Sequence, residues 1–200
     1  MTATSVTAGG TASNVTLTTT GGNIVLGLVT ASGDLVTLTS AGAITDGDAG
    51  AGNDVDASQL MTAAAGIGGA GANATIETTI SNLEASGGTD GVYLTNTGAL
   101  TIGGIGSMVG VSATGGHIVI TAASPLTVNE AVVDSGGGDI TLTASGATAA
   151  DDLTINANVT ASGGNGNISL SAGDDLLQTS GTISAVGSGA ITATAATGTA

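Results

Sequence analysis

Residues 136–163 read GGGDITLTASGATAADDLTINANVTASG, and this stretch decides the fold. It holds three short segments in which apolar and polar residues alternate, at 140–143, 153–156 and 159–161. Alternation with period two is typical of a strand that buries one face, and Thr, Val and Ile favour extended backbone. Gly, Ser, Asn and Asp separate the segments and favour turns. The stretch therefore predicts one coil of a β-solenoid, with three strands and three turns.

Segments of this kind recur along the whole chain. They begin at Val15, Val36, Val92, Ile118, Ile140, Ile168 and Ile191, with a degraded copy at Leu60. Their mean spacing of roughly 25 residues is typical of solenoid repeats. We therefore predict an all-β protein that folds as a parallel β-helix with three strands per coil, in about seven to eight coils of roughly 25 residues.

The repeats leave no clear boundary between domains, so we expect residues 1–200 to form a single β-solenoid segment. The section 46–90 fits the repeat least, because it contains the Gly/Asp-rich run DGDAGAGNDVDASQ and a loose stretch at 66–75. We expect two irregular coils with long loops there, and a short helix over 57–65 is the local alternative. Both ends lie within repeat-like sequence, which favours a segment internal to a longer protein.

The charge of the chain excludes several classes of partner. Lys and Arg are absent, whereas Asp and Glu number 15, which gives a formal net charge of −15. Such a surface has no electrostatic footprint for nucleic acid or anionic lipid. No apolar run is long enough to insert into a membrane. Tyr93 is the only aromatic residue, so the core has to be built from stacked aliphatic side chains.

Two pairs of aspartates form the first candidate cation site. Asp151-Asp152 and Asp174-Asp175 each precede the leucine that opens a second-type strand, one coil apart. Stacked coils would bring these carboxylates within roughly 5–7 Å of one another. Carboxylate oxygens are the ligands that Ca²⁺ prefers. The four aspartates are therefore a candidate Ca²⁺ site, and solvated turn aspartates are the favoured interpretation.

A weaker candidate is the acidic loop that contains Asp46, Asp48 and Asp54. Its alternation of Gly with Asp loosely resembles the calcium-binding nonapeptides of β-helices. Such sites form between consecutive turns, and the sequence holds one imperfect copy. The alternative interpretation is a flexible acidic loop.

The outward positions of the repeated segments form a candidate binding face. Hydroxyl groups occupy Thr16, Thr18, Thr37, Thr39, Thr141, Thr143, Ser169, Ser171, Thr192 and Thr194. Coils stack about 4.8 Å apart, so these groups would make a flat, uncharged array. The array resembles the Thr-x-Thr face of β-solenoid ice-binding proteins, and it would equally suit a glycan or a neighbouring fibre. The alternative is that Thr is present because it favours strands.

Catalysis has little support in the sequence. Some polysaccharide-cleaving enzymes use paired carboxylates as acid and base. Sugar-binding sites, however, generally contain aromatic side chains that stack on the sugar, or basic residues. His117 is the only histidine and has no adjacent nucleophile in the sequence. We predict no catalytic residue, no organic cofactor and no enzyme activity. A glycan-active enzyme is the least favoured alternative.

The runs GDITLTA (138–144) and DLTINANVTASGGNGNISLSAGDDL (152–176) resemble the repeats of filamentous haemagglutinin-type exoproteins, which are large bacterial surface proteins. The resemblance covers the chain most strongly over 91–195. It implies a right-handed parallel β-helix located outside the cell or on its surface. It also implies a structural or adhesive role, with self-association end to end or laterally into fibres. A host or matrix glycan or protein would be a further partner.

Overall fold

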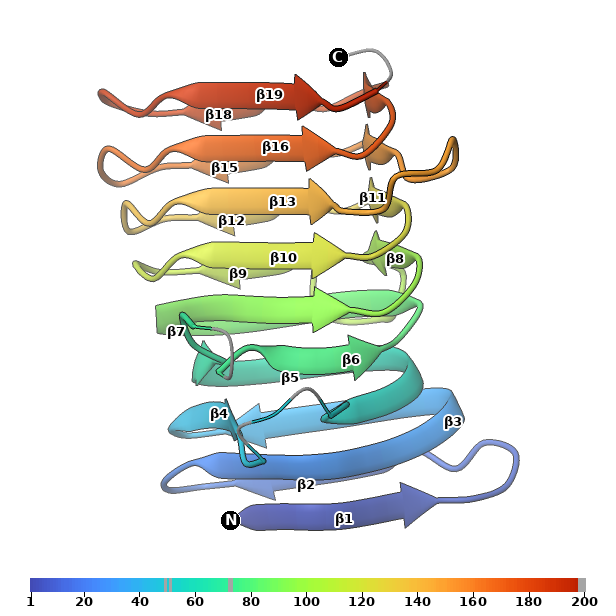
Figure 1. Ribbon diagram of the computed structural model, residues 1–200. Coiled ribbons are helices and arrows are strands. Elements are labelled where there is room, and N and C mark those ends of the chain that lie inside the picture. Colours follow the sequence, from blue (N-terminus) through green and yellow to red (C-terminus); the bar gives the residue numbers. More distant parts are fainter. Residues whose placement is uncertain (49, 51, 72–73, 198–200) are drawn as a thin grey trace.

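The computed structural model describes residues 1–48, 50, 52–71 and 74–197. The chain winds as a right-handed coil of about eight turns of ~23 residues, with parallel strands stacked from turn to turn (Figure 1). The predicted β-solenoid is therefore confirmed. The helix considered for 57–65 does not form, because a strand covers that segment. Among the described residues there is no helix long and apolar enough to cross a membrane.

The strands are short in the second half of the chain and long in the first. They are β1 (Thr2–Ala8), β2 (Val15–Thr19), β3 (Ile24–Ser40), β4 (Ala43–Asp46), β5 (Val55–Ile67), β6 (Ile76–Thr79), β7 (Asn82–Asn96), β8 (Leu100–Ile102), β9 (Val111–Ala113), β10 (Ile118–Ala122), β11 (Leu126–Val128), β12 (Val132–Asp134), β13 (Ile140–Ala144), β14 (Leu153–Ile155), β15 (Val159–Ala161), β16 (Ile168–Ala172), β17 (Leu176–Gln178), β18 (Ile183–Ala185) and β19 (Ile191–Ala195).

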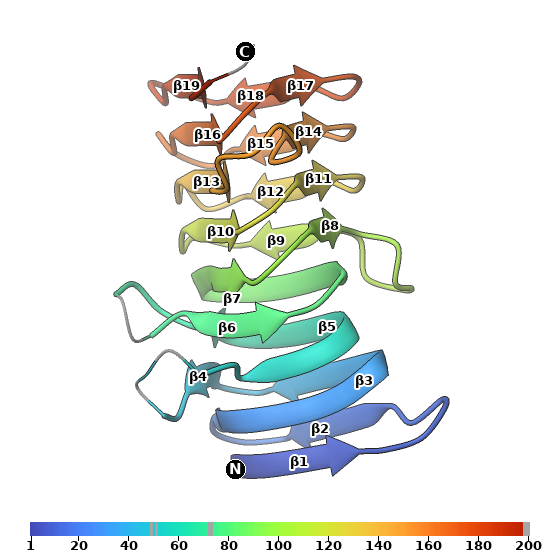
Figure 2. The ribbon, with the colours of Figure 1, turned by 45° about the vertical axis from the view of Figure 1, so that its right-hand side comes forward.

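From β8 onward each coil has three strands, which build three faces (Figures 1 and 2). The wide face contains the five-residue strands β10, β13, β16 and β19. The second face contains β8, β11, β14 and β17, and the third contains β9, β12, β15 and β18. As predicted, Ile140 is paired with Ile118 on one side and with Ile168 on the other.

The first half of the chain departs from the predicted alignment of the repeats. On the wide face, the column that leads to Ile118 contains Ile24, Ile44, Ile67 and Val92. Val15, Val36 and Leu60 instead stack with Leu83, which pairs with Ile102 of the second face. The alternating pattern identifies which side chains point inward, but it is the same on every face. It therefore could not tell these two columns apart.

The core consists of aliphatic side chains that stack on like side chains of the next coil. Leu142 lies between Ile120 and Leu170 in the ladder, and all three are at most 1% exposed. Burying one such side chain contributes about 1.5–3 kcal/mol. Asn96 takes an inward position in line with Ala122, and it is fully buried. Its Oδ1 accepts hydrogen bonds from the Thr78 hydroxyl and the Ile80 N–H, both at 2.9 Å.

Polar side chains at the corner before the wide face bond to the coil that follows. His117 Nδ1 accepts the Asp139 N–H at 2.9 Å, Asp139 Oδ1 accepts the Asn167 N–H at 2.7 Å, and Asn167 Oδ1 accepts the Ala190 N–H at 2.9 Å. The hydrogen bond that the charged Asp139 carboxylate accepts from a backbone N–H is stronger than one between two neutral groups. These side chains therefore extend the backbone ladder around the corner.

Glycines at the same corner let successive coils approach closely. A Cβ atom at Gly138 would lie 2.5 Å from the Gly116 carbonyl oxygen, and one at Gly166 would lie 2.2 Å from that of Gly138. At Gly189 the distance to the Gly166 carbonyl oxygen would be 2.1 Å. These distances are far below van der Waals contact with backbone atoms that cannot swing aside. We call Gly116, Gly138, Gly166 and Gly189 the glycine column.

A substitution in this column should weaken the stack. We expect Gly166→Ala to cost about 1–3 kcal/mol of unfolding free energy, because the added methyl group overlaps the coil below. Gly21→Ala is the matched control, since a Cβ atom at Gly21 meets nothing within 4 Å. Urea denaturation followed by circular dichroism measures both variants. Equal stability of the two would contradict the close approach.

Candidate functional site

Three carboxylates gather at the corner between the wide face and the second face. Asp152, Asp174 and Asp175 each have an oxygen within 4.8 Å of the others, and all three are partly buried. Asp152 Oδ1 accepts the Asp175 N–H at 3.1 Å. Asp174 Oδ1 accepts the Thr197 hydroxyl at 3.0 Å. The structure thus brings together three of the four aspartates that the sequence predicts for this site.

Asp151 is separated from this group and closes a loop instead. Its Oδ2 accepts the N–H and the hydroxyl of Thr148, both at 2.7 Å. The side-chain bond from Thr148, followed by the backbone bond, lowers the pKa of the Asp151 carboxyl. Consecutive residues of an extended chain point to opposite sides. One member of the Asp151-Asp152 pair therefore turns toward the loop and the other toward the neighbouring coil.

Neutralising one carboxylate of the corner group tests its electrostatics. We expect Asp174→Asn to raise the unfolding free energy by about 0.5 kcal/mol at low ionic strength, because like charges repel and salt screens them. The amide oxygen keeps an acceptor for Thr197. Asp90→Asn, at an exposed position, is the control. If Asp174→Asn lowered the stability and removed a response to chelator, the corner would hold a cation instead.

The acids of the weaker candidate loop do not gather in the same way. Asp48 makes its hydrogen bonds within its own loop. Its N–H donates to Asp46 Oδ1 at 2.8 Å, and its Oδ1 accepts the Gly50 N–H at 3.1 Å. Asp54, at the start of β5, is fully buried. Residues 49 and 51 of this loop lie outside the described residues. Within the described part of the chain, the corner group is the one set of three carboxylates that lie this close together.

The predicted hydroxyl array is divided between different faces. Thr141, Ser169 and Thr192 form one column of the wide face, and Thr143, Ser171 and Thr194 form the next. The other four belong to β2 and β3. The column that contains Thr16 and Thr37 continues through Met61 to Glu84. The column that contains Thr18 and Thr39 continues to Ser86 of the third face. The array on the wide face is therefore narrower than the sequence predicted.

The wide face gains two hydroxyls that the sequence analysis missed. Thr95 pairs with Thr121, and Thr121 pairs with Thr143. We call the resulting unbroken run the hydroxyl column: Thr95, Thr121, Thr143, Ser171 and Thr194. In the neighbouring column, Tyr93 and Val119 precede Thr141. None of these outward residues is charged. Their signal was in the repeats that begin at Val92 and Ile118, where Thr95 and Thr121 take the fourth position, as Thr143 does in its own repeat.

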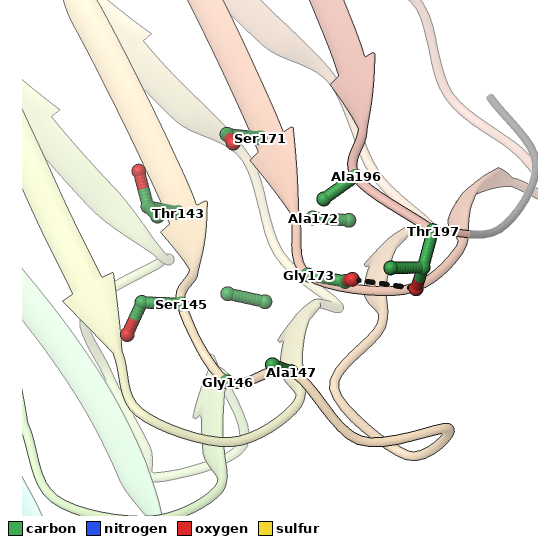
Figure 3. A pocket seen from close by; sticks show the side chains of 10 residues that line it. Thr143, Ser145, Gly146, Ala147, Ser171, Ala172, Gly173, Ala196 and Thr197 are labelled. Carbon is green, nitrogen blue, oxygen red and sulfur yellow. Dashed lines mark hydrogen bonds between the residues drawn. The ribbon is translucent and has the colours of Figure 1, made fainter.

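A shallow groove lies at the end of this face, beside Thr143 and Ser171 (Figure 3). Its volume is about 340 Å³. Ala147 and Gly173 contribute to its wall, and the Thr197 hydroxyl donates to the Gly173 carbonyl oxygen at 3.0 Å. None of the lining residues is charged or aromatic. The groove offers hydroxyl, methyl and backbone groups, and these supply no acid or base.

The sequence matches no protein-family model, and searches of curated proteins and of solved structures return no match. A solenoid fold by itself does not define an activity. The function of the chain has to be inferred from its surface chemistry and from the coils at its ends.

Proposed function

We propose that this chain is a structural, non-catalytic segment of a bacterial surface fibre or extracellular matrix, as an adhesin stalk, filament or layer. The main support is a continuous solenoid of parallel strands around one aliphatic core. The resemblance of 138–144 and 152–176 to haemagglutinin-type repeats supports its place outside the cell. The absence of Lys and Arg removes every trypsin site, which suits an exposed fibre.

The last coil presents the surface that such a fibre needs. Ile191 of β19 is 48% exposed, whereas its stacked neighbours Ile168 and Ile140 are at most 1% exposed. In the described chain β19 pairs with β16 alone. Its other edge therefore offers unpaired backbone groups beside apolar side chains, which is a template for another strand. At the opposite end Met1 is also 48% exposed. A further solenoid coil fits such an edge, and it would come from more of the same polypeptide or from another copy.

This proposal is tested by placing a charge at the open end. We expect the wild-type chain to form oligomers that grow with concentration, and Ile191→Asp to reduce them, because a carboxylate would be buried at the joint. Val109→Asp is the matched control, since Val109 is 70% exposed on the loop between β8 and β9. Sedimentation velocity and electron microscopy measure the assemblies. A monomer at all concentrations, or equal loss in both variants, would contradict end-to-end stacking.

The hydroxyl column favours a second role, lateral contact through the wide face. Its five hydroxyl groups lie on five neighbouring strands of the wide face, and none of these five residues is charged. The backbone ladders hold the hydroxyl groups about 4.8 Å apart. Because the chain has a net charge of −15, it repels a neighbouring molecule least at a strip of its surface that carries no charge. The partner would be a neighbouring fibre, a glycan or ice.

Lysines in this column should block the lateral contact. We expect the double variant Thr121→Lys and Thr143→Lys to abolish fibre bundling or glycan binding, because long charged side chains interrupt the flat strip. Thr127→Lys with Thr154→Lys places the same change on the second face, where these two residues are paired. Electron micrographs, glycan arrays and ice-crystal shape provide the measurements. Unchanged behaviour in the first variant would leave strand propensity as the explanation for these threonines.

A further inference from the structure

Two loops interrupt the solenoid at the same side in consecutive coils. The first joins β4 to β5 and the second joins β5 to β6, and Figure 2 shows both projecting on the left, one above the other. Acidic residues stand at the base of each loop. Asp46 ends β4, Asp54 precedes β5, and Glu77 lies in β6.

Asp54 and Glu77 are joined by backbone and side-chain bonds. The Asp54 N–H donates to the Glu77 carbonyl oxygen at 2.8 Å, and Asp54 Oδ2 accepts the Glu77 N–H at 3.1 Å. Glu77 Oε1 accepts the Thr75 hydroxyl at 2.6 Å. The remaining oxygens, Asp54 Oδ1 and Glu77 Oε2, are buried and have no hydrogen-bond donor. Two carboxyl groups from adjacent coils therefore each keep one unsatisfied oxygen.

The negative charge at this position is not compensated by the protein. The chain contains no Lys or Arg. The pKa of the Asp54 carboxyl is raised to about 8, chiefly by burial; the Glu77 N–H bond lowers it, and the charges of Asp46 and Glu77 and a side-chain hydrogen bond to Glu77 raise it. Because the chain has no Lys or Arg, a cation that meets the two unsatisfied oxygens has to come from solution.

We propose that Asp54 and Glu77 bind a Ca²⁺ ion between their two coils, with Asp46 adding negative charge to the site. The ion supplies the partner that Asp54 Oδ1 and Glu77 Oε2 lack, and it fastens the bases of the two loops together. Ca²⁺ suits the position because it accepts carboxylates and carbonyls in variable geometry. This set differs from the loop predicted from sequence, since Glu77 of the next coil takes part and Asp48 does not.

The test measures the melting temperature of the full chain with and without CaCl₂ after removal of metal by chelator. At a free Ca²⁺ concentration about 100 times Kd, we expect the melting temperature to rise by about 5–10 °C. Asp54→Asn and Glu77→Gln should each abolish this rise, and both are expected to fold because each amide has nearly the same size as the carboxyl group it replaces. Asp90→Asn, which removes an exposed carboxylate elsewhere, should keep it.

Two results would overturn the site. If Ca²⁺ did not shift the wild-type melting temperature, the two carboxyls would be satisfied by a shared proton. If the shift survived in both Asp54→Asn and Glu77→Gln, the ion would bind elsewhere, with the Asp152 corner group as the next position to mutate. Calorimetric titration with Ca²⁺ should also show binding by the wild type that is weakened in Asp54→Asn and in Glu77→Gln. Equal affinity in all three proteins would contradict the proposal.

Discussion

Each coil of this protein obtains its backbone hydrogen bonds from the coils on either side. A three-residue strand such as β14 pairs with β11 and β17, and it would not be stable alone. Ordering the backbone of one coil costs more conformational entropy than the burial of its few inward aliphatic side chains recovers. Stability therefore belongs to the stack, and an end coil is always the weakest part of it.

The absence of cationic side chains shapes the rest of the molecule. Carboxylates here bond to backbone amides instead of to Lys or Arg. Glu84 Oε1 accepts the N–H groups of Ile105 and Gly106, at 2.8 and 3.1 Å, and Glu130 accepts those of Gly104 and Gly110, at 3.0 and 2.7 Å. Two glutamates thereby hold the loop between β8 and β9. Asp54 Oδ1 has no such amide donor, and this is the observation from which the proposed cation site starts.

The sequence predicted the coil well and its alignment less well. Alternation at Ile140 and Leu142 identified inward positions, because a side chain's direction is a local property of extended backbone. The face to which a strand belongs depends on the lengths of the turns, and these vary between coils. The sequence analysis therefore aligned Val36 with Ile118, whereas in the structure Val36 belongs to the column that contains Ile102. The pairing of Asp54 with Glu77 has no local signal, since it arises from two loops of unequal sequence.

The glycine column also constrains how such a protein changes in evolution. Because successive backbones meet there without room for a side chain, the column fixes which residue stands at that position, whereas the length of the corner ranges from four residues between β9 and β10 to six between β15 and β16. The other two corners vary more in length: the connections before β9 and β14 have eight residues each, whereas those before β11 and β12 have three. Lineages of this fold should therefore keep glycine at these column positions, while longer loops accumulate at the other two corners.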